Sequence, residues 1–360
     1  MNHSEGRIIR TVTGDIAPRD LGRTSAHEHI LCDMSWGFAG KTRASDHRDV
    51  LVTSVAQSEL WWLREHHIDV LDNCVLDDID LAIREVGRFK QPGGVSIVDV
   101  TCDGLGPRPD DIRRISVESG VQIVLGCGHY VEDSHPAGLD DEPVESIAAR
   151  FVDDIETGIA GSSVRAGVIG ELGCSWPVRP NERKVLAAAA IAHGHTGVAI
   201  SVHTGRNRQA ARDHVDELGK QGVAPSSVVI CHVDRRIDDD AGLHQLAATG
   251  CFLAFDCFGL EPWIAPEARG MPMPGDVERA KMIAALIDGG YGENILVGQD
   301  IAMKHRLAEY GGHGYGYILR MVPTILEYVG LSQREIDTLL IDNPARAFSF
   351  ARPSRKERPS

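Results

Sequence analysis

The chain has 360 residues and a formal net charge of −15, with 42% hydrophobic and 25% charged residues, as is typical of a soluble globular protein. The acidic balance and the lack of a Lys/Arg stripe exclude a nucleic-acid groove, and no apolar run approaches the ~18 residues of a membrane-spanning helix. The eight cysteines include no CxxC pair, and no signal-peptide pattern is recognisable. We therefore expect a cytoplasmic protein with free thiols.

A short hairpin is predicted at the beginning of the chain. Residues 7–13 alternate weakly between apolar and polar side chains, and a turn pair follows at 14–15. Residues 23–33 predict the first core strand. The stretch 34–76 is long and irregular, and we interpret it as an insertion in the loop after this strand, with a helix at 50–66.

After the insertion, short apolar runs alternate with helical patterns. Further strands are predicted at 95–101, 121–127, 165–172, 198–203, 227–233, 251–257 and 294–299. Helices are predicted at 77–90, 110–119, 143–159, 181–193, 208–221, 239–249, 276–289, 315–329 and 332–349. Asn181 is the predicted N-cap of its helix.

This alternation predicts a (β/α)8 TIM barrel with a short N-terminal hairpin. Each of the eight strands is a nearly continuous apolar run, as in a parallel sheet that is buried on both faces. An open doubly wound sheet is the alternative, but the sequence contains no GxGxxG or GxxxxGK[ST] phosphate loop. We predict one domain over 1–352 and a disordered basic tail over 353–360.

Residue types that bind metals lie at or near the ends of several predicted strands. His27 and His29 occupy positions i and i+2 of the first strand, so their side chains share one face. The other candidates end or follow the fourth, fifth, sixth and eighth strands, in the order Glu171, His203, His232 and Asp300. In a (β/α)8 barrel, these strand ends meet at one mouth.

Four imidazoles and two carboxylates exceed the roughly four ligands that one Zn²⁺ takes. The set therefore predicts two divalent cations that share a carboxylate and a bridging water, which makes hydroxide available near neutral pH. A single His at a strand end is more often a hydrogen-bonded core residue, but six ligands at the same end of different strands favour a metal site. Zn²⁺ is the first choice, and Mn²⁺, Co²⁺ and Fe²⁺ also suit these ligands.

The sequence resembles the phosphotriesterase-related family of the amidohydrolase superfamily over about residues 7–350. The resemblance rests on the segments Thr24-Ser25-Ala26-His27-Glu28-His29, Arg165-Ala166-Gly167-Val168-Ile169-Gly170-Glu171, Val202-His203-Thr204, Cys231-His232-Val233-Asp234, Gln299-Asp300 and Asp342-Asn343-Pro344-Ala345-Arg346. It implies a distorted (β/α)8 barrel, a binuclear divalent metal centre and a homodimer. It also implies that the more buried ion is held by His27, His29 and Asp300, and the more exposed one by His203 and His232.

One position departs from the best-known members of this family. Organophosphate-hydrolysing members bridge the two ions with a carbamylated Lys on strand 4, whereas that strand contains no Lys here and ends in Glu171-Leu172-Gly173. Glu171 is the natural substitute, as in the branch that resembles the phosphotriesterase homology proteins. The change weakens the case for phosphotriesterase activity and predicts that the site assembles without CO₂.

The resulting hypothesis is a binuclear metal-dependent hydrolase of a small-molecule lactone, another carboxylic ester or an amide. A bridging hydroxide would attack, and Asp300 would accept its proton and pass it to the leaving group. A phosphotriesterase or phosphodiesterase is the second reading. A non-catalytic binding protein on the same fold and a mononuclear deaminase are further alternatives.

Four residues are predicted to contact the substrate. Tyr130 follows the third strand, where lactonases of the family are similar in carrying a Tyr. Arg235, Lys304 and His305 follow the sixth and eighth strands, and cations near the mouth of an acidic protein could bind a carboxylate or phosphate. Ordinary loop salt bridges are the alternative for these cations.

Overall fold

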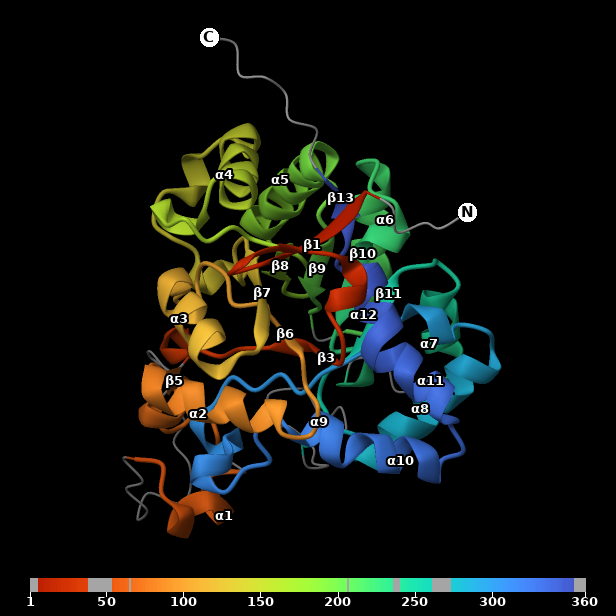
Figure 1. The fold of residues 1–360 in the computed structure, drawn as a ribbon. Helices are drawn as coiled ribbons and strands as arrows, with labels where there is room; N and C mark the ends of the chain where they lie inside the picture. Colours follow the sequence, from red (N-terminus) through yellow and green to blue (C-terminus); the bar gives the residue numbers. More distant parts are fainter. Residues whose placement is uncertain are drawn as a thin grey trace.

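Eight parallel strands form the central sheet, in the order β12-β11-β10-β9-β8-β7-β6-β3 (Figure 1). The computed structural model describes residues 6–37, 54–64, 66–205, 207–235, 240–260 and 273–352. The strands are β3 (Thr24–Glu28), β6 (Ser96–Asp99), β7 (Gln122–Cys127), β8 (Val168–Gly173), β9 (Ile200–His203), β10 (Val228–Cys231), β11 (Phe252–Phe255) and β12 (Ile295–Val297). At the seam, the N–H of His29 donates to the carbonyl of Ile301, and the N–H of Asp300 donates to that of His27. The sheet is thus nearly closed, and the predicted barrel is confirmed.

Alternate strand residues face two apolar layers. Val98, Val124 and Val229 pack into one cluster, whereas their neighbours Ile97 and Ile230 belong to the larger cluster that includes the helices. Successive side chains of a strand point to opposite faces, and both faces of this sheet are covered. Both sets of positions are therefore apolar, which explains the nearly continuous hydrophobic runs of the sequence.

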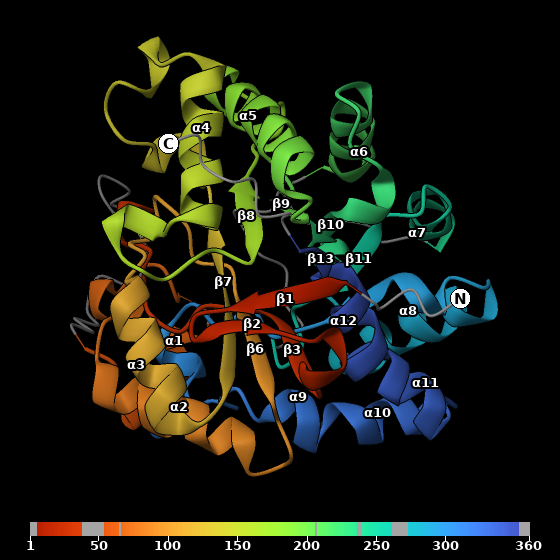
Figure 2. The same ribbon diagram turned by 45° about the horizontal axis from the view of Figure 1, so that its top comes forward.

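Helices surround the barrel and separate successive strands (Figures 1 and 2). They are α2 (Ile79–Lys90), α3 (Pro109–Ser119), α4 (Val144–Glu156), α5 (Pro180–Thr196), α6 (Ala210–Lys220), α7 (Asp240–Ala247), α8 (Asp276–Asp288), α9 (Tyr317–Arg320), α10 (Val322–Tyr328), α11 (Gln333–Asp337) and α12 (Asn343–Ala347). Within the described part of the chain, none of the helices is both long and apolar enough to cross a membrane.

The start of α5 differs from the prediction. Asn181 is inside the helix, which begins at Pro180 with Arg179 as its N-cap. Proline suits the first helical position because its missing N–H would have no intrahelical partner there. Glu182 completes the start by accepting a hydrogen bond from the Arg179 N–H at 2.9 Å.

The two long C-terminal helices predicted at 315–329 and 332–349 are interrupted. The first divides into α9 and α10 before Pro323, and in the second a π-helical turn separates α11 from α12, which contains Pro344. A proline cannot donate to the carbonyl four residues earlier, so each one breaks the regular helical ladder.

The predicted N-terminal hairpin is present as β1 (Arg7–Thr11) and β2 (Gly14–Ile16). A third strand, β13 (Phe350–Ala351), pairs with β1 from the far end of the chain. The N–H of Val12 donates to the carbonyl of Ile123 at the start of β7, so the hairpin crosses the N-terminal ends of the barrel strands (Figure 2). The hairpin therefore does not cover the opposite end of the barrel, where the C-terminal ends of the strands and the predicted ligands lie.

The insertion after β3 contains less helix than predicted. β4 (Cys32–Asp33) pairs with β5 (Val75–Leu76), and the predicted helix at 50–66 is reduced to a 3-10 turn at Gln57–Glu59 and α1 (Leu60–Leu63). Its apolar side chains form a separate cluster with Val70 and Tyr310 instead of lining one helix face. Residues 50–53 and 65 of this predicted helix and the predicted tail at 353–360 lie outside the described residues.

Candidate metal centre

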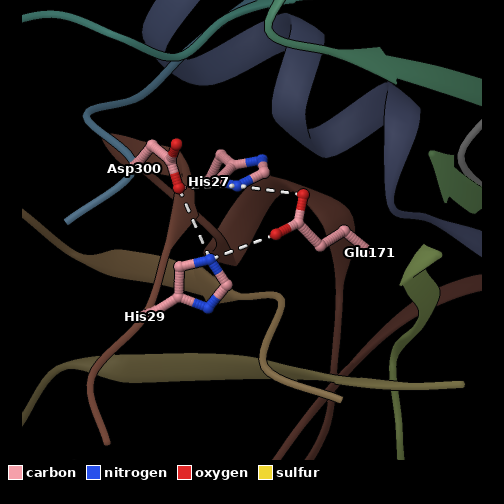
Figure 3. A group of neighbouring side chains, drawn as sticks. All are labelled: His27, His29, Glu171 and Asp300. Atoms are coloured by element: carbon pink, nitrogen blue, oxygen red, sulfur yellow. Dashed lines mark ion pairs between the residues drawn. The ribbon is translucent and has the colours of Figure 1, made fainter. Parts of the chain in front are cut away.

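The six predicted ligands converge at the C-terminal end of the barrel. His27 lies on β3, His29 directly after it, and Glu171 on β8. His203 is the last residue of β9, His232 follows β10, and Asp300 lies in the loop after β12. Figure 3 shows four of these side chains pointing toward one another. The strand ends meet because the parallel strands all run in one direction.

One group of potential ligands consists of His27, His29, Glu171 and Asp300, whose ligand atoms lie within 4.8 Å of one another. The Nε2 of His29 is 3.3 Å from Glu171 Oε1 and 3.5 Å from Asp300 Oδ1. The Nε2 of His27 is 3.4 Å from the same Asp300 oxygen. This His27 nitrogen is buried and makes no well-aligned hydrogen bond within the described residues.

A second group shares Glu171 with the first and adds His203 and His232. The Oε2 of Glu171 is 3.2 Å from His203 Nδ1 and 3.3 Å from His232 Nε2. The two imidazole nitrogens are themselves 2.9 Å apart. Glu171 therefore contacts both groups: its Oε1 faces His29, whereas its Oε2 faces His203 and His232 and also lies 3.6 Å from His27 Nε2.

The charges of the cluster depend on one another because it is buried. Burial disfavours the charged form of His29, but the nearby Asp300 and Glu171 outweigh this effect and raise its pKa to about 9. Burial opposes charge on Glu171 as well, yet His27 and His203 hold its pKa well below the ordinary value. The ionised carboxylates of this buried cluster are therefore stable only with positive charge beside them. Divalent metal ions fit this need, because neutral imidazole and carboxylate are their usual ligands.

Two of the candidate ligands have left-handed backbone conformations, with φ of 60° at His232 and 52° at Asp300. Such conformations cost about 1–3 kcal/mol and persist where neighbours hold them. Asp256 accepts the backbone N–H of His232 at 3.1 Å. Glu28 accepts the N–H groups on both sides of Asp300, from Gln299 at 3.1 Å and from Ile301 at 3.0 Å.

Sequence reasoning missed the parts played by Glu28, Thr101 and Asp256. Thr101 Oγ1 is 2.9 Å from Nδ1 of His29, and Asp256 contacts Nδ1 of both His27 and His232. Asp256 directly follows the buried strand β11, so the rule that identified ligands at strand ends could have found it. Glu28 lay within a motif, but two of its partners, the N–H groups of Gln299 and Ile301, come from a loop that is distant in the sequence.

Two predicted substrate residues lie beside the cluster. The Tyr130 hydroxyl is 3.1 Å from His203 Nδ1, and Arg235 Nη2 is 3.4 Å from Asp300 Oδ2. Burial disfavours charge on Arg235, but the surrounding anions, Asp300 among them, outweigh it and raise the pKa of the guanidinium. Arg235 is therefore a cation at the cluster.

The other two, Lys304 and His305, face the insertion after β3. Lys304 Nζ is 2.6 Å from Asp72 Oδ1, and the backbone N–H of His305 donates to Asn73 Oδ1 at 2.9 Å. Burial, aided by Arg306, lowers the pKa of His305 to about 3, so its ring is neutral at pH 7. Lys304 thus makes the loop salt bridge that was the alternative, and the role of both residues in substrate binding stays a prediction.

Comparison with known proteins agrees with this geometry. A model of the phosphotriesterase family matches residues 7–348. An N-acetyltaurine hydrolase from Salmo salar is 36% identical over 344 residues, covering 95% of this chain and 98% of that protein. The structure of a resiniferatoxin-binding protein from Rhodobacter sphaeroides is 35% identical, with a TM-score of 0.90 and 95% of both chains covered. A lactonase from Listeria monocytogenes is 27% identical, with a TM-score of 0.78, covering 96% of this chain and 100% of that one.

The barrel, with imidazoles and carboxylates gathered at its mouth, is that of a metal-dependent hydrolase. The chain belongs to the phosphotriesterase family. The resemblance read from the sequence motifs is thereby confirmed over nearly the whole chain.

Proposed function

We propose that this chain is a binuclear metal-dependent hydrolase that cleaves a small carboxylic amide or ester. The observation that carries the proposal is the position of Glu171, which belongs to both groups of potential ligands, with Oε1 facing His29 and Oε2 facing His203 and His232. The first ion would be held by His27, His29 and Asp300, and the second by the two remaining imidazoles, with Glu171 between them. The shorter carboxylate of Glu171 would then bridge the two ions, as a carbamylated Lys does in other members of the family.

When bound, two such ions would supply an activated water and polarise the carbonyl oxygen of the substrate. Asp300 is suited to move the proton. Its Oδ1 faces His27 and His29, whereas its Oδ2 faces Arg235. The second oxygen can therefore take a proton from the attacking water and give it to the departing amine or alkoxide.

Two relatives direct the choice of substrate. The Salmo salar protein is named for N-acetyltaurine, an amide with an anionic sulfonate, and the Listeria monocytogenes protein is named a lactonase. We propose N-acetyltaurine and related N-acyl anions as the first compounds to test, with lactones second and aryl phosphotriesters as the contrast. Arg235 would bind the anionic end, and Tyr130, beside His203, would contact the reacting carbonyl.

The metal assignment predicts that Glu171→Ala lowers the metal content from about two equivalents per chain to one or fewer. Removing the shared carboxylate takes a ligand from both sites and leaves the imidazoles of each with too few donors. Elemental analysis of protein purified without chelators measures this directly. The control is Glu182→Ala, which removes another buried carboxylate whose partners are Glu132, Ser175 and Arg179 and not a proposed ligand. One equivalent or none on the unaltered chain, not increased by added metal, would contradict the binuclear proposal.

Replacing Arg235 by Met is expected to raise KM for an anionic N-acyl substrate about 10- to 100-fold, because a hydrogen bond to a charged group is worth roughly 1.5–3 kcal/mol. A neutral amide or lactone should change much less in KM. The comparison of the two substrates on one variant separates recognition of the anion from damage to the neighbouring Asp300. Lys304→Met serves as the control, since Lys304 pairs with Asp72. An equal rise in KM for both substrates would contradict the role.

Three finer points belong to the same proposal. Zn²⁺ is the first ion to test, because four imidazoles suit it well. All eight cysteines are free and buried, which supports a reducing compartment such as the cytoplasm. The homodimer is proposed from the family alone and is measured by light scattering.

A further inference from the structure

Asp256 joins the two groups of potential ligands from behind. It follows β11 and is fully buried. Its Oδ1 lies 2.8 Å from Nδ1 of His232, and its Oδ2 lies 3.2 Å from Nδ1 of His27. His27 belongs to the first group and His232 to the second. One carboxylate thus contacts one imidazole of each group.

The chemistry of the contact determines which nitrogen of each ring can bind a metal. An ionised carboxylate only accepts hydrogen bonds, so both imidazoles must carry their proton on Nδ1. The lone pairs are then on Nε2, and these are the nitrogens that face the shared Glu171, at 3.6 Å from His27 and 3.3 Å from His232. Such outer partners orient metal-binding histidines and make them more basic.

His29, directly after β3, has a different kind of partner. Nδ1 of His29 meets the neutral hydroxyl of Thr101 at 2.9 Å, and that hydroxyl serves this ring alone among the ligands. Thr101 therefore supports an imidazole of the first group only, whereas Asp256 supports one imidazole of each group.

We propose that Asp256 is a positioning residue for both halves of the metal centre. The inference rests on the proposed two-metal function. Asp256 acts through the two imidazoles and through the backbone of His232, whose N–H it also accepts at 3.1 Å. Loss of this carboxylate therefore weakens two metal sites, although Asp256 is not one of the six proposed ligands.

Zinc binding to metal-free protein, measured by competition with a chelator, tests the proposal with three variants. Asp256→Ala should weaken both zinc equivalents at least tenfold, as removal of an outer partner typically costs 10- to 100-fold in metal affinity. Asp256→Asn keeps the shape but offers one accepting oxygen, so one equivalent should weaken at least tenfold while the other changes little. Thr101→Val should weaken only one equivalent. Circular dichroism of each variant checks that the barrel is folded.

A second readout separates positioning from packing. Long-range ¹H–¹⁵N spectra of the zinc-loaded protein should show His27 and His232 protonated on Nδ1. In Asp256→Asn, the ring that faces the amide N–H should switch to the Nε2–H form, and this ring should no longer bind zinc. Two undiminished zinc equivalents in Asp256→Ala, or unchanged ring protonation in Asp256→Asn, would overturn the inference while leaving the proposed function intact. Fewer than two equivalents on the unaltered chain would overturn both.

Discussion

Replacing Asp300 by Asn should lower kcat by about 10²- to 10⁴-fold, the usual contribution of a general base, while at least one metal equivalent stays bound. An amide cannot accept the proton that the carboxylate takes in the proposed reaction. Its oxygen can still face His27 and His29, which contact Oδ1 of the native carboxylate at 3.4 and 3.5 Å. The fall should therefore be mainly in kcat, with less change in KM.

The measurement pairs steady-state kinetics with metal content on the same preparation. Asp103→Asn is the matched control, because Asp103 lies just after β6 but its side chain is 54% exposed and contacts His129 instead of the cluster. That variant should keep nearly normal turnover. Near-normal turnover in Asp300→Asn with metal bound would refute the role of Asp300 as proton acceptor.

Replacing Arg279 by Met should lower the free energy of unfolding by about 3–5 kcal/mol, as expected when one partner of a buried ion pair is removed. Arg279 Nε lies 2.8 Å from Asp234 Oδ2, and both side chains are 0% exposed. Arg279 also contacts Asp276 Oδ1 at 2.7 Å. Without the guanidinium, Asp234 would be left buried without its ion-pair partner, in the loop after β10 and two residues beyond His232.

Chemical denaturation of metal-free protein measures this effect without a contribution from metal binding. The control is Arg212→Met, which removes an exposed i, i+4 pair with Asp216 on α6 and should cost less than about 0.5 kcal/mol. Adding Asp234→Asn to Arg279→Met should recover part of the loss, since the buried charge is then gone. A loss below about 1 kcal/mol in Arg279→Met would show that the pair contributes little to stability.

The sequence alone predicted the six ligands of the candidate centre. Each of the six ligands stands at or just beyond the end of an apolar run, and parallel strands bring such ends to one place. The barrel itself followed from eight such runs alternating with helices. The predictions that failed concern helix boundaries near Pro180, Pro323 and Pro344, where local backbone chemistry outweighed the periodic pattern, and the helix at 50–66, whose apolar side chains form a separate cluster instead.

The sequence by itself determined the fold class and the residue types at the mouth, because strand periodicity and strand ends are local properties. The tertiary structure alone decided which partners complete these residues. Asp256 meets His27 and His232, Glu28 holds the amides beside Asp300, and β13 joins β1 across almost the whole chain. These pairings connect segments up to hundreds of residues apart. The sequence pattern of either partner contains nothing about the other, and only the closed barrel brings the two within hydrogen-bonding distance.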